Sequence, residues 1–324
     1  MDEKGGQGSK TDQEDESRPN PDAGVGVACG MTAFLIWGLS PLYWKALAAV
    51  PAFEILMHRM VWSFVFLVPI LVVMGGWGDL LAALRRPRTV GVLCLTTVVV
   101  ATNWFVFIWA INHDQVLQTS LGYYINPLVN VMLGMVVLKE RLRRLQWIAV
   151  GLAGVAVTGL TVFYGQFPGI ALWLALTFGC YGLIRKMAAV GALVGLTVET
   201  FLLSVPAAGY LVYLDRAGAG AFYRDGPATS FLLMGAALVT ALPLLLFTLG
   251  AKRIHFSTVG FLQYLAPSCS FLLAVFVFGE PIAPAQLIAF ALIWTALGLY
   301  TADSVRVYRR AARRLETQRA GKAG

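Results

Sequence analysis

Residues 127–149 read PLVNVMLGMVVLKERLRRLQWIA, and residues 267–289 read PSCSFLLAVFVFGEPIAPAQLIA. The two stretches share a proline, a glutamate and a glutamine at a constant offset of 140 residues: Pro127, Glu140 and Gln146 match Pro267, Glu280 and Gln286. Earlier in the chain, Trp37-Gly38 and Phe178-Gly179 match at an offset of 141. A nearly constant offset over several apolar segments indicates an internal repeat that covers most of the chain.

The composition shows which solvent the repeat occupies. Apolar residues make up 58% of the 324 residues, charged residues only 13%, and the mean hydropathy is +0.71. A soluble domain has about a quarter of its residues charged, so this chain cannot cover a water-facing surface. Residues 1–23 are polar and predict a disordered tail. We therefore expect an integral membrane protein.

Ten apolar segments are long enough to cross a bilayer as helices, which need roughly 17–25 residues. They are 24–44, 55–74, 90–111, 116–138, 145–164, 168–184, 192–214, 230–250, 258–278 and 282–301. The lysines and arginines alternate sides: 21 of the 25 lie in the two tails and in the loops that follow the second, fourth, sixth and eighth segments. Basic residues stay in the cytoplasm, so both termini are expected there.

The parity of the repeat predicts the architecture. Residues 24–164 form one five-helix unit and 165–303 a second, between the N-tail 1–23 and a basic C-tail 304–324. Five is odd, so the second unit enters the membrane from the opposite side. The predicted fold is an all-α integral membrane protein with ten transmembrane helices in two inverted five-helix repeats. Many secondary transporters have this design, with a substrate site near the midplane and alternating access.

Several motifs resemble those of a known family. The fourth helix of each half ends in an apolar run closed by glutamate (LKE at 138–140, FGE at 278–280), as in EamA repeats of the drug/metabolite transporter superfamily. Finer motifs resemble the RarD family: FLIWG at 34–38, EILMHR at 54–59, NW at 103–104, LGYYINPLVN at 121–130 and GFLQYLAP at 260–267. The resemblance covers about residues 24–303. It implies an exporter-like permease of the cytoplasmic membrane, often labelled a chloramphenicol-sensitivity protein.

Charged residues inside the apolar segments form a first group of candidates. A charge at the centre of a bilayer costs roughly 2.5–3.5 kcal/mol, so it requires a partner or a role. The candidate charge and proton cluster comprises Glu54, His58, Arg59 and Glu199. Arg59 is expected to pair with Glu54 or Glu199, and His58 is a candidate carrier of a coupling proton. The alternative is a structural ion pair near the membrane surface.

The second group is the candidate substrate site. Pro127 and Pro267 are expected to interrupt two helices at repeat-related positions, a sequence feature that marks transporter sites. The residues expected to line one central cavity around them are Asn103, Trp104, Tyr123, Asn126, Asn130, Gln263 and Tyr264. Glu140 and Glu280 close their helices at the membrane edge and are interpreted as structural.

The sequence favours a secondary transporter of small organic metabolites or drugs over other classes. It contains no HExxH or GxSxG motif and no cluster of metal ligands, so we expect no enzyme, no metal and no cofactor. A structural or lipid-scrambling membrane protein remains the alternative, and a membrane-embedded enzyme is less favoured. The expected partners are a small-molecule substrate, membrane lipid and a coupling proton, with no nucleic acid. The sequence gives no oligomeric state.

Overall fold

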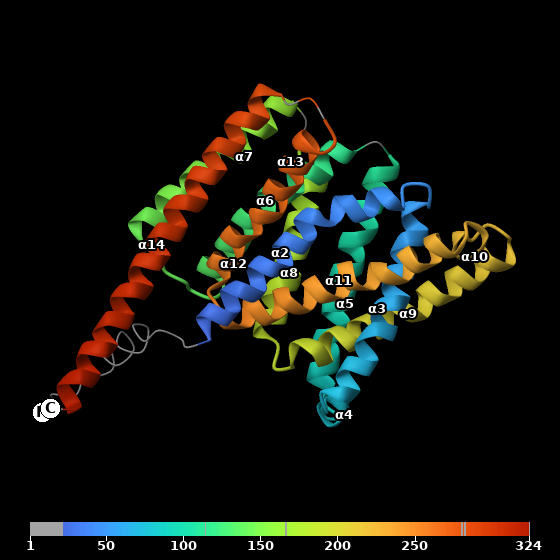
Figure 1. Ribbon diagram of the computed structural model, residues 1–324, viewed down its shortest axis with the longest axis horizontal. Coiled ribbons are helices and arrows are strands. Elements are labelled where there is room, and N and C mark those ends of the chain that lie inside the picture. Colours follow the sequence, from blue (N-terminus) through green and yellow to red (C-terminus); the bar gives the residue numbers. More distant parts are fainter. Residues whose placement is uncertain (1–21, 114, 166, 280, 282, 324) are drawn as a thin grey trace, which may run out of the picture.

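The computed structural model describes residues 22–113, 115–165, 167–279, 281 and 283–323, and these are helical over most of their length (Figure 1). The longer helices are α2 (Ala23–Ala46), α3 (Ala52–Val73), α5 (Pro87–Asn112), α6 (Val116–Val136), α7 (Arg144–Tyr164), α8 (Gly169–Met187), α9 (Ala192–Arg216), α11 (Pro227–Arg253), α13 (Leu265–Phe276) and α14 (Pro284–Ala323). Three shorter ones are α4 (Trp77–Leu84), α10 (Ala221–Arg224) and α12 (Phe256–Gln263).

The helices confirm the predicted all-α membrane fold. Among the described residues, nine helical segments are long and apolar enough to cross a membrane, with α12 and α13 counted together and α14 contributing Pro284–Val307. The tenth predicted segment corresponds to α6, which is less apolar because it contains amides such as Asn126 and Asn130. Each predicted span therefore corresponds to one helix or to the α12–α13 pair. The polar N-tail lies outside the described residues.

The helix contacts follow the symmetry of the repeat. Exchanging α2 with α8, α3 with α9, α5 with α11, α6 with α12–α13, and α7 with α14 reproduces the main neighbours. Thus α6 packs on α8, and α12 and α13 pack on α2; likewise α5 packs on α8, and α11 packs on α2. The pairs α3–α9, α6–α12 and α7–α14 lie across the symmetry axis. In Figure 1, α7 and α14 lie side by side at one edge, while α3 and α9 lie toward the other.

Individual residues repeat their contacts as well. The side-chain oxygen of Gln146 accepts from the backbone N–H of Arg143 at 3.0 Å, and that of Gln286 accepts from Ala283 N at 3.1 Å. Each glutamine satisfies a free backbone donor at the start of the last helix of its repeat. The turn just before those helices contains a left-handed residue in both halves, Lys139 (φ 56°) and Gly279 (φ 67°). The sequence offset of 140 is therefore also a structural one.

Two ends of the bundle differ in charge. At one, Lys186 of α8 donates to Ala251 O of α11 and to Ile254 O just after α11, both at 2.6 Å, and Lys252 of α11 donates to Ala188 O after α8 at 2.6 Å. The loop between α6 and α7, rich in arginine, meets the start of α12 at the same place. We call this the basic end. The opposite end, where α10 lies, we call the α10 end.

The two prolines do not act alike, contrary to the expectation. The second-half helix is interrupted at Tyr264, three residues before Pro267, whereas α6 runs through Pro127 without a break. Proline removes a backbone donor and crowds the carbonyl one turn earlier, which explains the interruption before Pro267. Glycines allow α6 and α8 to pack closely on both sides of Pro127: Gly122 of α6 meets Ala171 and Leu174, and Gly179 of α8 meets Val129 and Asn130.

Candidate functional site

The two halves meet in a buried polar contact. Asn130 of α6 donates its side-chain amide to Oε1 of Gln263 at the end of α12, at 2.6 Å. Asn130 is fully buried and Gln263 nearly so. The Oδ1 atom of Asn130 is buried with no hydrogen-bond partner. Asn130 belongs to the first repeat and Gln263 to the second, so the contact joins the two halves.

Glycine allows this contact to form. At Gly260, one turn before Gln263, a Cβ atom would lie 2.6 Å from Pro127 O and 3.2 Å from the Cβ of Asn130. Any larger residue would push α12 away from α6. Tyr264, also buried, donates its hydroxyl to Tyr124 O at 3.3 Å and adds a second link between the same helices. The crossing of α6 and α12 lies in the half of the bundle toward the basic end.

Asn126 lies one turn from Asn130 on the side of the α10 end. It is buried, and its Oδ1 has no hydrogen-bond partner. An unsatisfied amide oxygen in an apolar interior costs about 1–3 kcal/mol. The structure thus brings together Asn126, Asn130, Gln263 and Tyr264 from the predicted substrate site, and leaves two amide oxygens of this group without a partner.

The other predicted site residues have partners outside this group of amides. Asn103 of α5 donates to Leu174 O at 2.9 Å and Thr177 Oγ1 at 2.8 Å, so it joins α5 to α8. Tyr123 has 49% of its surface exposed and contacts Phe107 edge to face at 6.2 Å. Trp104 of α5 lies near Arg59, with the guanidinium 5.8 Å from its ring centre.

The predicted charge cluster is divided into three parts. Glu199 of α9 pairs with Arg185 of α8, with Nε 3.5 Å from Oε1. Its carboxylate also accepts from Thr96 Oγ1 at 2.5 Å and from the Tyr181 hydroxyl at 3.1 Å. Arg185 has 0% of its surface exposed and donates to Ala192 O at 3.0 Å. This network holds α5, α8 and α9 together.

Glu54 and His58 form the second part, at the α10 end. Glu54 Oε1 accepts from Ala221 N at 2.6 Å, which satisfies a backbone donor at the start of α10. The same oxygen lies 3.9 Å from His58 Nε2. His58 accepts from Trp62 Nε1 at 3.2 Å and stacks on Phe222 with ring centres 5.1 Å apart. Both side chains therefore help to attach the α10 segment to α3.

Arg59 is the third part, and it pairs with neither glutamate. Its Nε donates to Thr240 Oγ1 of α11 at 2.8 Å, and its guanidinium lies 5.0 Å from the ring centre of Trp44. Within the described part of the chain, Arg59 forms no ion pair with a carboxylate. A guanidinium held by aromatic rings instead of a carboxylate is unusual inside a membrane protein.

Sequence reasoning missed the partners of these charges. Arg185 was assigned to a loop, because the sixth span was expected to end at residue 184; α8 continues to Met187 and buries Arg185 instead. Its neighbours Thr96 and Tyr181 carried no signal, since single hydroxyls are common in transmembrane helices. Thr240 and Trp44 gave none either. A helical projection of α8 would have placed Tyr181 and Arg185 four residues apart on one face.

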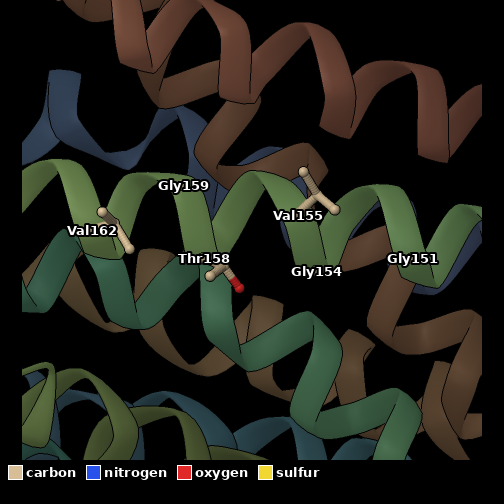
Figure 2. Close-up of a pocket in the computed structure, with 6 residues that line it drawn as sticks. All are labelled: Gly151, Gly154, Val155, Thr158, Gly159 and Val162. Carbon is tan, nitrogen blue, oxygen red and sulfur yellow. The ribbon is translucent and has the colours of Figure 1, made fainter.

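A surface groove on α7 is no candidate for the substrate site. It is lined by Gly151, Gly154, Val155, Thr158, Gly159 and Val162 (Figure 2). All six residues come from one helix, and only Thr158 contributes a polar side chain. The groove is thus an open depression in the outer face of α7, away from the amides where the two repeats meet.

Comparison with known proteins agrees with this architecture. The model of the EamA-like transporter family matches residues 24–162, which is the first repeat. A solved structure described as "Crystal structure of protein" aligns with a TM-score of 0.67 and 20% identity, covering 88% of this chain and 99% of that one. This likeness concerns the fold. Fold and family match together define a multi-pass membrane transporter of the EamA type.

Two relatives narrow the class. The chain is 44% identical to "Protein RarD" of Streptomyces exfoliatus over 292 residues, covering 90% of this chain and 93% of the relative. It is also 44% identical to the "Uncharacterized transporter YojE" of Bacillus subtilis over 288 residues, covering 87% and 95%. The chain belongs to the RarD family of EamA-type transporters, in the drug/metabolite transporter superfamily. Such a transporter moves a small molecule across a membrane.

Proposed function

We propose that the protein is a secondary active transporter, most simply an exporter, that moves small organic molecules across the cytoplasmic membrane by alternating access. The observation that carries this proposal is the contact of Asn130 with Gln263 across the axis of two inverted repeats. A contact at such a position can form in one conformation and open in the other, because the two halves exchange roles when they rock.

The helix packing favours a particular conformation for the transport cycle. At the basic end, α6 is in close contact with α12 at Gly260. Beyond Tyr264, α13 packs against α2. Tyr123, on the part of α6 toward the α10 end, is half-exposed. We infer a state whose central site is closed at the basic end and reached from the α10 end, which the positive-inside rule assigns to the outside.

The proposed energy source is an ion gradient or exchange, with a proton as the first candidate. The chain supplies no nucleotide-binding motif. His58 is the titratable group proposed to carry the proton, because it lies 3.9 Å from a carboxylate oxygen of Glu54. Release of the substrate would then be linked to the protonation of the Glu54–His58 pair.

Reconstitution tests transport and its energy source together. Metabolite pools of cells that lack or overproduce the protein identify the transported compound. That compound is then followed into proteoliposomes that hold only buffer, with and without an imposed pH difference. We expect uptake without ATP, an effect of the pH difference, and loss of that effect in His58→Ala. Uptake that requires ATP contradicts secondary transport, and equal uptake at all pH differences in both proteins contradicts proton coupling.

A matched control separates the pair from general damage. His113 lies outside the charge cluster, and its Nδ1 is 2.8 Å from the backbone carbonyl of Trp109 in the preceding turn. His113→Ala should keep both the rate and the pH effect. Equal loss in both histidine variants would show that the effect of His58→Ala is not specific to the Glu54 pair.

A further inference from the structure

The guanidinium of Arg59 is held in a fixed orientation by residues from both repeats. Its Nε donates to Thr240 Oγ1 at 2.8 Å, while the Thr240 hydroxyl donates to Ala236 O at 2.8 Å within α11. The rings of Trp44 and Trp104 lie near it, with centres 5.0 and 5.8 Å from the guanidinium carbon. Arg59 thus contacts α2, α5 and α11 while belonging to α3.

The terminal nitrogens of Arg59 remain available. Neither terminal nitrogen donates a hydrogen bond to another described residue, and neither is a fully buried atom without a partner. Glu54, the one carboxylate in the described helix α3, is engaged elsewhere and bonds to Ala221 N. On the facing helix α9, Glu199 bonds to Arg185. The charge of Arg59 therefore has aromatic neighbours but no counter-charge from the described residues.

An unpaired cation at this depth is costly. Arg59 lies about two turns into α3 from the α10 end, which places it inside the apolar span. Cation–π contacts with two indoles offset part of the cost. The free edge of a guanidinium matches a carboxylate in a bidentate geometry, which is the strongest neutralising contact available to it.

We propose that Arg59 is the binding residue for an organic anion with an aromatic body. The carboxylate of the ligand accepts from the terminal nitrogens of Arg59, and its ring lies among Trp44, Trp104 and Tyr123. Tyr123 is half-exposed and contacts Phe107 of α5, the helix that also carries Trp104. The proposal rests on the proposed function, and it gives the substrate class of the transporter: amphipathic anions.

The position fits the inferred conformation. Trp44 ends α2, Trp104 lies in the last third of α5, and Tyr123 lies in the second turn of α6, all toward the α10 end. A ligand that enters from that end reaches Arg59 before it reaches the Asn130–Gln263 contact. The unsatisfied Asn126 Oδ1 lies one turn deeper on α6 and could accept from a donor on the same ligand.

Direct binding tests the proposal without a transport assay. The purified protein in nanodiscs of phosphatidylcholine, which has no net charge, is titrated calorimetrically with benzoate, indole-3-acetate, their uncharged amides, benzylammonium and inorganic phosphate. We expect both carboxylates to bind at least about tenfold more tightly than their amides, and benzylammonium and phosphate to bind more weakly still. Absent binding of both carboxylates, or equal binding of acids and amides, overturns the proposal. Phosphate that binds as tightly as benzoate overturns the aromatic part.

Variants assign the contact to Arg59. Arg59→Gln should weaken benzoate binding by about 10- to 150-fold, the range for a lost charge-assisted hydrogen bond, and leave benzamide unaffected. Arg59→Lys keeps the positive charge but loses the bidentate geometry of the guanidinium, so its affinity for benzoate should lie between those of the unchanged protein and Arg59→Gln. Arg216→Gln removes an exposed arginine from the α10 end and should bind benzoate normally. Unchanged binding in folded Arg59→Gln and Arg59→Lys places the anion elsewhere.

The outcomes also separate this proposal from transport itself. Selective binding through Arg59 in a protein that moves no solute in liposomes would support the anion site and refute the transport function. Transport of uncharged or cationic compounds with no effect of Arg59→Gln would support the transport function and refute the anion site.

Discussion

Asn130 of the first repeat and Gln263 of the second share a hydrogen bond of 2.6 Å where α6 crosses α12. Their sequence separation of 133 residues differs by seven from the repeat offset of 140, so the bond joins the two halves at positions that are not equivalent in the repeat. The neighbouring bond of Tyr264 to Tyr124 O joins equivalent positions, since these two residues are 140 apart. Both bonds link α6 to the second half of the chain.

Removing either amide should weaken the protein and its transport together. Asn130→Ala or Gln263→Ala leaves a buried partner unsatisfied and should lower the free energy of unfolding by about 1–3 kcal/mol. Denaturation in mild detergent measures the first effect and liposome flux the second. The double variant Asn130→Leu/Gln263→Leu should regain most of the stability, because neither polar group is left behind. Thr295→Ala on the exposed side of α14 is the control. Normal flux in both single variants would place the moving contact elsewhere.

The buried pair of Arg185 and Glu199 should be sensitive to the loss of one partner. Glu199→Gln leaves the fully buried Arg185 without a counter-charge, and the expected loss of stability is about 3–5 kcal/mol. Thr96→Val, which removes one hydrogen bond to the same carboxylate, should cost about 1 kcal/mol. Unfolding in detergent by a denaturant measures both.

Replacing both partners provides the control for that experiment. Arg185→Met with Glu199→Met removes both charges and should recover much of the stability lost in Glu199→Gln. The exposed pair of Arg224 and Asp225, at 2.8 Å, should tolerate Asp225→Asn with little change. A double variant as unstable as Glu199→Gln would show that the network matters through its hydrogen bonds and not its charge.

Glu140 should make the basic end sensitive to acid. Burial opposes its ionisation, but the nearby His255 ring, 3.7 Å away, and the backbone N–H groups of Ser257 and Phe256, which donate to the carboxylate, outweigh that effect and lower its pKa from 4.5 to about 2. A pKa that is lower in the folded state stabilises the protein above the unfolded value, so this contribution is lost as the pH falls from about 4.5 toward 2. Unfolding measured over that range should show the loss.

Glu140→Gln should flatten this pH dependence and lower stability at pH 7 by about 0.5–2 kcal/mol, as for the loss of other helix caps. Asp215→Asn, at an exposed site in the last turn of α9, should leave the acid response intact. An unchanged acid response in Glu140→Gln would contradict the assigned role of this carboxylate.

The orientation in the membrane can be tested with reporters. The basic end carries most of the lysines and arginines, so we expect it in the cytoplasm with both termini. A reporter that is active only outside the cytoplasm should be silent when fused after Gly324 and active when inserted at Gly218, in the connection between α9 and α10. The opposite pattern would reverse the orientation, and activity at both positions would contradict the even number of spans.

The sequence predicted the fold well because lipid imposes strong constraints. Apolar length and the repeat at offset 140 were enough to place the ten spans and to give the inverted arrangement. The sequence also pointed to Asn130 and Gln263 as neighbours in one central cavity, because amides in the middle of a span need partners. It did not show the partners of the charged residues. Arg59 bonds to α11, which is distant in sequence, and Glu199 bonds to Arg185, which was expected to lie in a loop after α8.

Proline was also an incomplete guide. Pro127 and Pro267 occupy the same place in the two halves, yet only the second half is interrupted. A proline lowers the cost of a break but does not determine one, since the packing of neighbouring helices decides whether the backbone stays straight. The difference is small, because the backbone at Tyr264, where α12 and α13 meet, keeps helical angles (φ −62°, ψ −15°).

The last helix is much longer than a membrane is thick. At 1.5 Å per residue, the 40 residues of α14 extend about 60 Å, twice the roughly 30 Å of hydrocarbon. In Figure 1 it runs beside α7 and then continues past the other helices. Since α7 and α14 belong to different repeats, a small tilt between them is magnified along this rod. The distance between a fluorophore near the end of α14 and a second one on α4 would therefore change measurably with such a tilt, and it could be followed in a single molecule.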